Sequence, residues 1–204
     1  MLASSRRSAR IDRVPNCSGL FPIRALPALL ALAIGLSGCA VSERHAASER
    51  AFAESLALLE RERYAAALSM LDTLAAHRPD DAAVHVNRAL ALQALERDQD
   101  ARQALQAALQ ADPNHAEAHN LMAIQLRRAG RFDAARRHYE QLLEAHPEHA
   151  HGHLNLAILC DIYLADLECA HHYYRRYLAL SNEQDEEVTN WLTDLERRLP
   201  GEDS

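Results

Sequence analysis

The feature that most constrains the fold is a proline that recurs every 34 residues. Pro79, Pro113 and Pro147 stand in similar settings, "AAHRPDDA", "LQADPNHA" and "LEAHPEHA". A fixed period of this length indicates repeated supersecondary units. Alanine and leucine dominate the chain and only 5% of its residues are aromatic, which favours helices over strands. Since one unit cannot bury its apolar face alone, the units are expected to stack into a continuous core.

The 34-residue period and its small residues resemble the tetratricopeptide repeat over residues 48–181. With the proline at position 32, the units are 48–81, 82–115, 116–149 and 150–181. The resemblance implies small side chains at positions 8 and 20, where the two helices of a unit approach each other. They are Ser55, Ala89, Ala123 and Ala157 at position 8, and Ala67, Ala101, Ala135 and Ala170 at position 20. Ala170 fits if the fourth unit carries one extra residue in its turn. Gly130 stands in the turn of the third unit, and the second unit lacks a glycine there.

The fold class predicted by this resemblance is all-α, a right-handed α-solenoid of four helix hairpins. Residues 182–204 add a capping helix and tail, in which Val188, Trp191 and Leu195 follow helical spacing. We expect Trp191 to lie in the core, although the helix could instead bind a partner. The tyrosines of "HHYYRRYLAL", residues 171–180, exceed what packing needs, so some are expected to face a partner.

The N-terminal segment has the pattern of a targeting signal. A basic start, "SSRRSARIDR", precedes an apolar stretch at residues 25–36. Twelve helical residues rise only about 18 Å, too short for a hydrocarbon core of about 30 Å. The pattern therefore predicts a cleaved signal peptide, residues 1–38, rather than a transmembrane helix.

The signal ends in Leu36-Ser37-Gly38-Cys39, which resembles the lipobox of bacterial lipoproteins. The resemblance implies cleavage before Cys39, acylation of its thiol and a lipidated polar tether at residues 39–47. Two or three acyl chains make a lasting membrane anchor. Ala40, rather than Asp, follows the cysteine, which by the same resemblance implies an outer-membrane lipoprotein facing the periplasm. The alternatives are an ordinary signal peptide with an incidental cysteine, and a cytoplasmic repeat protein with no true signal.

The charge balance and the lack of catalytic motifs argue against several classes of function. After residue 38 the chain holds 17 Arg against 28 acidic residues, which argues against nucleic acid as a partner. No nucleophile motif or glycine-rich phosphate loop is present, so we expect neither an enzyme nor a cofactor. Histidines cluster in "HPEHAHGHLN", residues 146–155, where His149 and His153 are a weak candidate metal pair. Adventitious surface histidines are the alternative, because no further ligand completes a known zinc spacing.

Positions 2, 5, 9, 12 and 13 of the units are expected to line a concave groove for a protein segment. The candidate partner-binding residues are Val86, Leu90, Gln93, Asn120, Ile124, Arg127, Arg128, Leu154, Ile158 and Asp161. The floor is apolar with charges at one edge, which suits an apolar helix or an extended segment. Some of these residues could instead only pack against the next unit. The chain has no lysine, so it lacks the carboxylate clamp of chaperone-binding repeats.

Cys160 and Cys169 are the cysteines that remain once Cys39 is acylated and Cys17 is removed with the signal. They fall near the end of one helix and early in its antiparallel partner. A disulfide is therefore geometrically plausible in an oxidising periplasm. Two small buried thiols are the equal alternative.

The function these features predict is a lipid-anchored periplasmic scaffold that helps assemble an envelope complex such as a pilus, a secretin or an energised transport system. The rival hypothesis is a periplasmic enzyme or metal-handling protein that uses the histidine cluster.

Overall fold

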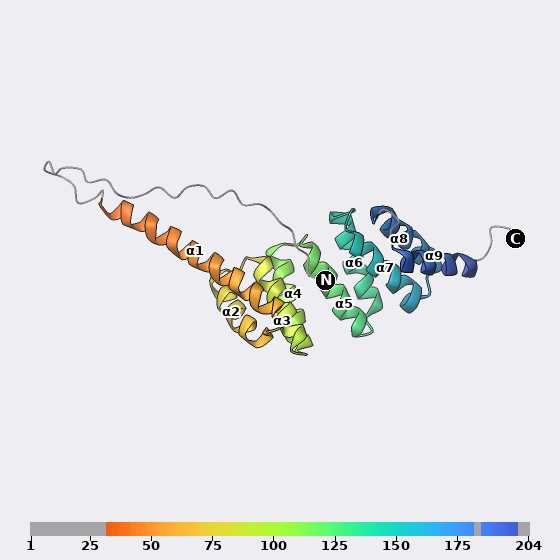
Figure 1. The fold of residues 1–204 in the computed structure, drawn as a ribbon, viewed down its shortest axis with the longest axis horizontal. Coiled ribbons are helices and arrows are strands. Elements are labelled where there is room, and N and C mark those ends of the chain that lie inside the picture. The colour runs from red at the N-terminus through yellow and green to blue at the C-terminus, as the bar shows by residue number, and fades with distance from the viewer. Residues whose placement is uncertain (1–31, 182–184, 200–204) are drawn as a thin grey trace. The chain divides into compact units, whose positions relative to one another are not determined.

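The computed structural model describes residues 32–181 and 185–199, and every regular element in these ranges is a helix (Figure 1). The chain divides into two units, residues 1–43 and 44–204, and the second holds all of the predicted repeats. In chain order the helices are α1 (Leu32–Glu60), α2 (Tyr64–His77), α3 (Ala82–Ala94), α4 (Asp98–Ala111), α5 (Ala116–Arg128), α6 (Phe132–Ala145), α7 (Ala150–Ile158), η1 (Leu159–Leu164), α8 (Leu167–Leu180) and α9 (Glu186–Arg198). The all-α fold predicted from the sequence is confirmed.

The first helix begins earlier than the first predicted repeat. It covers 29 residues, so residues 39–47, predicted to be a tether, continue the same helix. Residues 1–31, most of the predicted signal peptide, lie outside the described residues, as does the side chain of Cys39. Among the described helices, none combines the length and the apolar character that a bilayer crossing requires.

Each hairpin is built around a crossing of small side chains. Ser55, Ala123, Ala157 and the four alanines of position 20 have no exposed surface, and Ala89 has 2%. Small side chains let the helix axes come within about 8–10 Å. The residue at position 24 fills the space beside the crossing, and Leu71, Leu105, Tyr139 and Tyr174 are all buried. We call the first helix of each hairpin the A helix (α1, α3, α5, α7) and the second the B helix (α2, α4, α6, α8).

A left-handed residue joins the two helices of every hairpin. Glu62, Glu96 and Gly130 have φ of 58°, 61° and 71°, and they lie 34 residues apart. In these three turns the next residue donates its N–H to the carbonyl five positions earlier, as Arg131 does to Leu126 at 2.9 Å. This bond is the Schellman closure of a helix C-terminus, which usually places glycine at the left-handed position. The first two hairpins therefore use glutamate where glycine is the relaxed choice.

The fourth hairpin accommodates one extra residue, as the sequence predicted. Its left-handed residue is Ala165, with φ of 52°, which lies 35 rather than 34 residues after Gly130. The closing bond runs from the Asp166 N–H to the Cys160 carbonyl, six positions earlier, at 2.9 Å. The wider turn is η1, a π-helix that follows α7 without a break. π-helical segments arise from single-residue insertions and are frequent at functional sites.

A disulfide joins the two helices of this wider turn. Cys160 in η1 and Cys169 in the first turn of α8 are bonded, and their Cα atoms lie 5.9 Å apart. Cys160 is fully buried and Cys169 is half-buried. The cross-link therefore closes the one turn in which the 34-residue spacing is broken.

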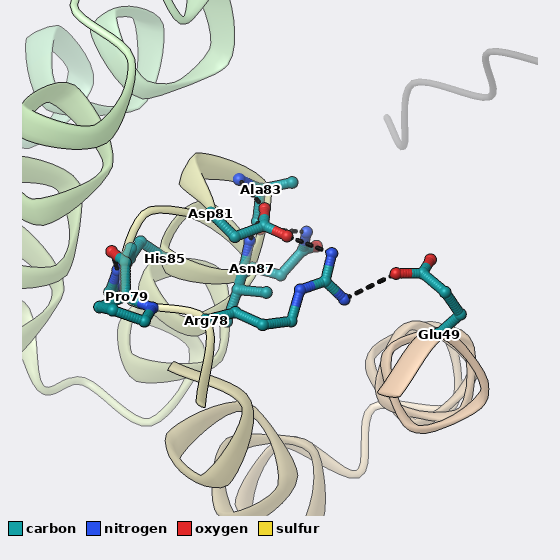
Figure 2. A network of polar contacts seen from close by, with 8 residues as sticks. Glu49, Arg78, Pro79, Asp81, Ala83, His85 and Asn87 are labelled. Atoms are coloured by element: carbon teal, nitrogen blue, oxygen red, sulfur yellow. Dashed lines mark hydrogen bonds and ion pairs between the residues drawn. The ribbon is translucent and has the colours of Figure 1, made fainter. Parts of the chain in front are cut away.

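A polar network holds α1 and α2 against α3 (Figure 2). The Arg78 guanidinium lies 2.9 Å from the Glu49 carboxylate of α1, also pairs with Asp81, and sits 5.7 Å from the Phe52 ring centroid. Asp81 in turn caps α3, because its carboxylate accepts the N–H groups of Ala83 and Val84. One arginine thus connects the first hairpin to the start of the second.

The C-terminal helix α9 packs on α8, with Val188 and Leu195 buried. Its N-cap Asp185 accepts the Val188 N–H and the Tyr177 hydroxyl, at 3.1 and 2.8 Å. The prediction of a core position for Trp191 is wrong. Its side chain is 37% exposed, and its ring only covers that of Tyr174 at 6.0 Å between centroids.

The expectation that some of the α8 tyrosines face a partner stays a prediction, and among Tyr173, Tyr174 and Tyr177 it can apply only to Tyr173. Tyr174 and Tyr177 are 1% and 8% exposed, because α9 covers them. Tyr173 is half-buried and packs against the ring of His153 at 5.8 Å between centroids.

The left-handed turn residues predict opposite effects of two substitutions. Glu96→Gly should raise the free energy of unfolding by about 0.5–1 kcal/mol, because glycine adopts this φ without strain. Gly130→Ala should lower it by about 1 kcal/mol. A Cβ at Gly130 meets no atom within 4 Å, so this cost is one of backbone conformation alone. Urea unfolding measures both changes.

Ala129→Gly is the control for these two variants. The φ of Ala129 is −82°, so glycine there should not stabilise the protein. A loss of stability in Glu96→Gly would contradict the assignment.

The disulfide predicts that the purified protein has no free thiol at Cys160 or Cys169. Non-reducing mass spectrometry under conditions that block exchange measures this directly. Reduction should lower the free energy of unfolding by about 2–3 kcal/mol, the chain-entropy value for a loop of about ten residues. Two free thiols in freshly isolated protein would exclude the bond.

Candidate partner-binding groove

The A helices α3, α5 and α7 carry nine of the ten residues predicted to line the groove, and η1 carries the tenth, Asp161. We call this surface the A-helix groove. Leu90, Ile124, Leu154 and Ile158 are half-buried and pack with one edge against the core. Each therefore keeps part of its apolar surface free. A row of half-exposed apolar side chains on successive rigid helices can accept the apolar face of a protein segment.

Three of the ten predicted residues are committed to internal contacts. Val86 is 4% exposed and belongs to the core. Asn120 is 8% exposed, and its Oδ1 accepts from Nδ2 of Asn155 on the next A helix at 2.9 Å. Asp161 pairs with Arg198 of α9 at 3.0 Å, and only 14% of its side chain is exposed. These residues hold neighbouring elements together and do not offer a binding surface.

The polar and charged side chains predicted at one edge of the groove remain at least partly exposed. Arg128 is exposed, and Gln93 and Arg127 are half-buried. The Arg127 guanidinium lies 5.6 Å from the Tyr163 ring centroid, and that ring lies 5.0 Å from the ring of Phe132. This stacking orients Arg127 at the end of the groove.

Among the residues whose burial the structure describes, the most exposed large apolar side chains stand in η1. Ile162 is 67% exposed and Tyr163 is 43% exposed. Tyr163 was not among the predicted binding residues. The signal that could have found it is the extra residue of the fourth unit, because an insertion displaces the side chains that follow it from their repeat positions.

Glu117 on α5 supplies a carboxyl group beside the buried Asn120. Burial raises the pKa of Glu117, while the hydrogen bond with Asn120 acts in the opposite direction. A carboxyl group in such surroundings favours a partner that donates a hydrogen bond or brings a positive charge.

The histidines of the repeats have structural partners. The Nε2–H groups of His85, His119 and His153 donate to the carbonyls of Pro79, Pro113 and Pro147 at 2.8, 2.9 and 2.8 Å. The bond thus recurs with the 34-residue period and fastens each A helix to the preceding proline. Histidine enrichment at these positions follows from the repeat.

The two histidines of the candidate metal pair, His149 and His153, also make structural hydrogen bonds. Nδ1 of His149 accepts the Gly152 N–H at 2.9 Å and caps α7, while His153 donates to Pro147. His115 caps α5 in the same way, through Nδ1 and the Ala118 N–H. In the described part of the chain, no group of three or more His, Cys, Asp or Glu side chains is placed to hold a metal ion.

Burial lowers the pKa of several of these imidazoles. It lowers the pKa values of His115, His149 and His153, and in each case desolvation is the largest cause. The pKa of His138 falls to about 4, because burial acts together with the charges of His119 and Arg137. Nδ1 of His138 lies 3.1 Å from Nδ1 of His119. In the His119 tautomer that donates to Pro113 through Nε2, Nδ1 is the acceptor for the His138 N–H.

Two family models described as tetratricopeptide repeat match the chain, one at residues 58–124 and the other at residues 120–161. A comparison with curated protein sequences gives no significant match.

Several solved structures share the fold. PilF of Pseudomonas aeruginosa is 21% identical with a TM-score of 0.68, over 76% of this chain and 70% of its own. MamA of Desulfovibrio magneticus RS-1 is 22% identical with a TM-score of 0.64, over 74% and 84%. A structure of Naa15/Naa10 bound to HypK-THB is 20% identical with a TM-score of 0.60, over 74% of this chain and 22% of that one. At these identities the similarity establishes the fold alone.

The lowered pKa values predict a loss of stability in mild acid. Because the folded-state pKa of His138 lies below the unfolded value of about 6.5, the unfolded chain binds the proton more readily. The contribution of His138 is therefore complete above about pH 6.5 and is lost as the pH falls towards about 4. His115, His149 and His153 act in the same direction.

Urea midpoints measured from pH 7.5 to pH 5 test this prediction, and His138→Gln is the informative variant. Glutamine can still donate to His119 but does not titrate, so the variant should lose less stability on acidification than the wild type. Parallel pH profiles for the two proteins would contradict the role of His138.

Proposed function

Because the chain is built of tetratricopeptide repeats, we propose that it is a lipid-anchored, non-catalytic scaffold of the bacterial cell envelope that binds a protein segment in the A-helix groove. The observation that carries this proposal is the row of Leu90, Ile124 and Ile158, half-buried on three successive A helices. The row continues into the exposed Ile162. An apolar row about three helices wide suits an amphipathic helix or an extended segment.

The rigidity of the scaffold supports this function. The wall of the groove is fixed by Asn120 and Asn155, its charged end by the stacking of Arg127 on Tyr163, and η1 by its disulfide. A surface already held in its binding geometry loses less conformational entropy when a partner docks. Naa15, which has the same fold, is bound to protein partners in its solved structure.

The N-terminal sequence supports the anchor and the location. Leu36-Ser37-Gly38-Cys39 follows a short apolar stretch and a basic start. Processing at this site would leave Cys39 as the first residue, acylated and continuous with the rest of α1. With Ala40 next, we place the protein at the periplasmic face of the outer membrane. There it would help assemble a pilus, a secretin or an energised transport complex.

Site-specific photocrosslinking in cells tests the groove. A photoreactive residue at position 162, which is 67% exposed in the native protein, should give a discrete adduct with one protein. Ile124→Asp should remove that adduct, because a carboxylate in the row would be desolvated by the partner. Leu180→Asp, a half-buried leucine at the end of α8, is the matched control and should leave it intact. An adduct that persists in a folded Ile124→Asp variant would overturn the groove assignment.

Radiolabelled palmitate and membrane fractionation test the anchor. Cys39→Ala should abolish labelling and leave uncut precursor or released protein, because no other thiol stands at the cleavage site. Cys17→Ala, which changes the other cysteine of the N-terminal segment, should label and fractionate like the wild type. Normal fractionation of Cys39→Ala would exclude the lipoprotein assignment.

A further inference from the structure

A depression lies between the B helices α4 and α6 and has a volume of about 740 Å³. We call it the glutamine cleft. Its floor is apolar and includes Met122 and Leu126 of α5, both 5% exposed. Its walls are polar, and those side chains are Gln99, Arg102, Gln103, Gln106, Gln110, Arg131, Arg137, His138 and Gln141.

Helical spacing produces these walls. Gln99, Gln103, Gln106 and Gln110 follow one another at intervals of four, three and four residues, so they share one face of α4. On α6, Ala134, His138 and Gln141 have the same spacing. Helix α4 therefore presents four amide side chains to this space, and α6 presents the imidazole of His138 and the amide of Gln141.

The charge of the cleft is opposite to that of the chain. No Asp or Glu lines it, whereas Arg102, Arg131 and Arg137 all do. The chain after residue 38 has an excess of acidic residues. In the described part of the structure, the salt bridges of other arginines include Arg97 with Asp100, Arg88 with Asp72 and Arg136 with Glu140, and the three cleft arginines make none.

We propose that the glutamine cleft binds an extended, acidic protein segment. A guanidinium group holds a carboxylate through two parallel hydrogen bonds, so the three arginines select acidic side chains. Each glutamine amide can both donate and accept, so the α4 face can pair with the backbone of a segment lying along it. The apolar floor receives the stems of the bound side chains.

The length of the α4 face matches a short extended segment. From Gln99 to Gln110 the helix rises about 16 Å, a distance that about five extended residues span.

The glutamine cleft is separate from the A-helix groove. Met122 and Ile124 are two residues apart on α5, so they point about 200° away from each other. Both surfaces can therefore be occupied at the same time. The acidic segment would be a second point of attachment, on the same partner or on another subunit of the assembly.

Fluorescence anisotropy with the full-length protein tests the proposal. The probe is a fluorescein-labelled peptide of alternating Glu and Ala, about seven residues long, and the control peptide carries Gln in place of Glu. The wild type should bind the Glu peptide and not the Gln peptide, with an affinity that falls as salt is raised.

Two charge-matched variants assign the binding to the cleft. Arg102→Glu/Arg137→Glu should weaken binding roughly tenfold or more, the effect of losing one or two charge-assisted contacts. Arg175→Glu/Arg176→Glu changes two exposed arginines of α8 by the same charge and should bind like the wild type. Circular dichroism and the urea midpoint check folding. Arg102→Gln/Arg137→Gln, which adds no negative charge, should also bind measurably less.

Three results would overturn the proposal. The first is no binding of the Glu peptide by the wild type, and the second is an equal loss in both double Glu variants. The third is binding of phosphatidylglycerol vesicles, sensitive to Arg102 and Arg137, without binding of the peptide. That result would assign the cleft to a membrane surface.

Discussion

The structure depends on the close crossing of the two helices in each hairpin, which is possible because the side chains at the crossing are small. At positions 8 and 20 of each hairpin the residue is serine or alanine and is buried. A larger side chain at either position would push the helices apart. The position-24 residue would then lose its contacts, and the next hairpin would no longer meet a continuous surface. The row of half-exposed apolar side chains in the A-helix groove exists only because successive A helices keep this spacing.

The fourth hairpin shows how the solenoid tolerates a break in its period. One additional residue would rotate everything after it by about 100° if the helix absorbed it without adjustment. The π-helical turn takes up the residue instead, so Ala170 still reaches the crossing and is fully buried. The same widening pushes Ile162 and Tyr163 outwards. A local change in backbone geometry has thus created exposed apolar surface without a loss of packing in the core.

The sequence predicted most of the fold because its strongest signal, the 34-residue period, reports packing that repeats. The same signal located the extra residue before Ala170. The period could not predict contacts between a repeat and the capping helix, because that helix is not part of the repeat. Asp161 occupies a groove position in the repeat numbering, but its carboxylate forms a salt bridge with Arg198 of the capping helix and is not free to contact a partner.

Trp191 shares a helix face with Val188 and Leu195, yet α9 is the last helix described and no further hairpin covers that edge. The glutamine cleft was also missed. Regularly spaced glutamines on one helix are ordinary solvent-facing residues until a second helix brings arginines to the same space.

Contacts between hairpins run mainly from each element to the next along the chain. In such a linear array, stability is close to a sum of local terms, so different parts open with different free energies. The last hairpin and α9 are joined to the rest on one side only, whereas the second and third hairpins are supported on both. Amide hydrogen exchange should therefore be slowest in the middle of the array and faster towards its C-terminal end. A ligand that bridged several A helices would couple these separate openings and make the array unfold more nearly as one body.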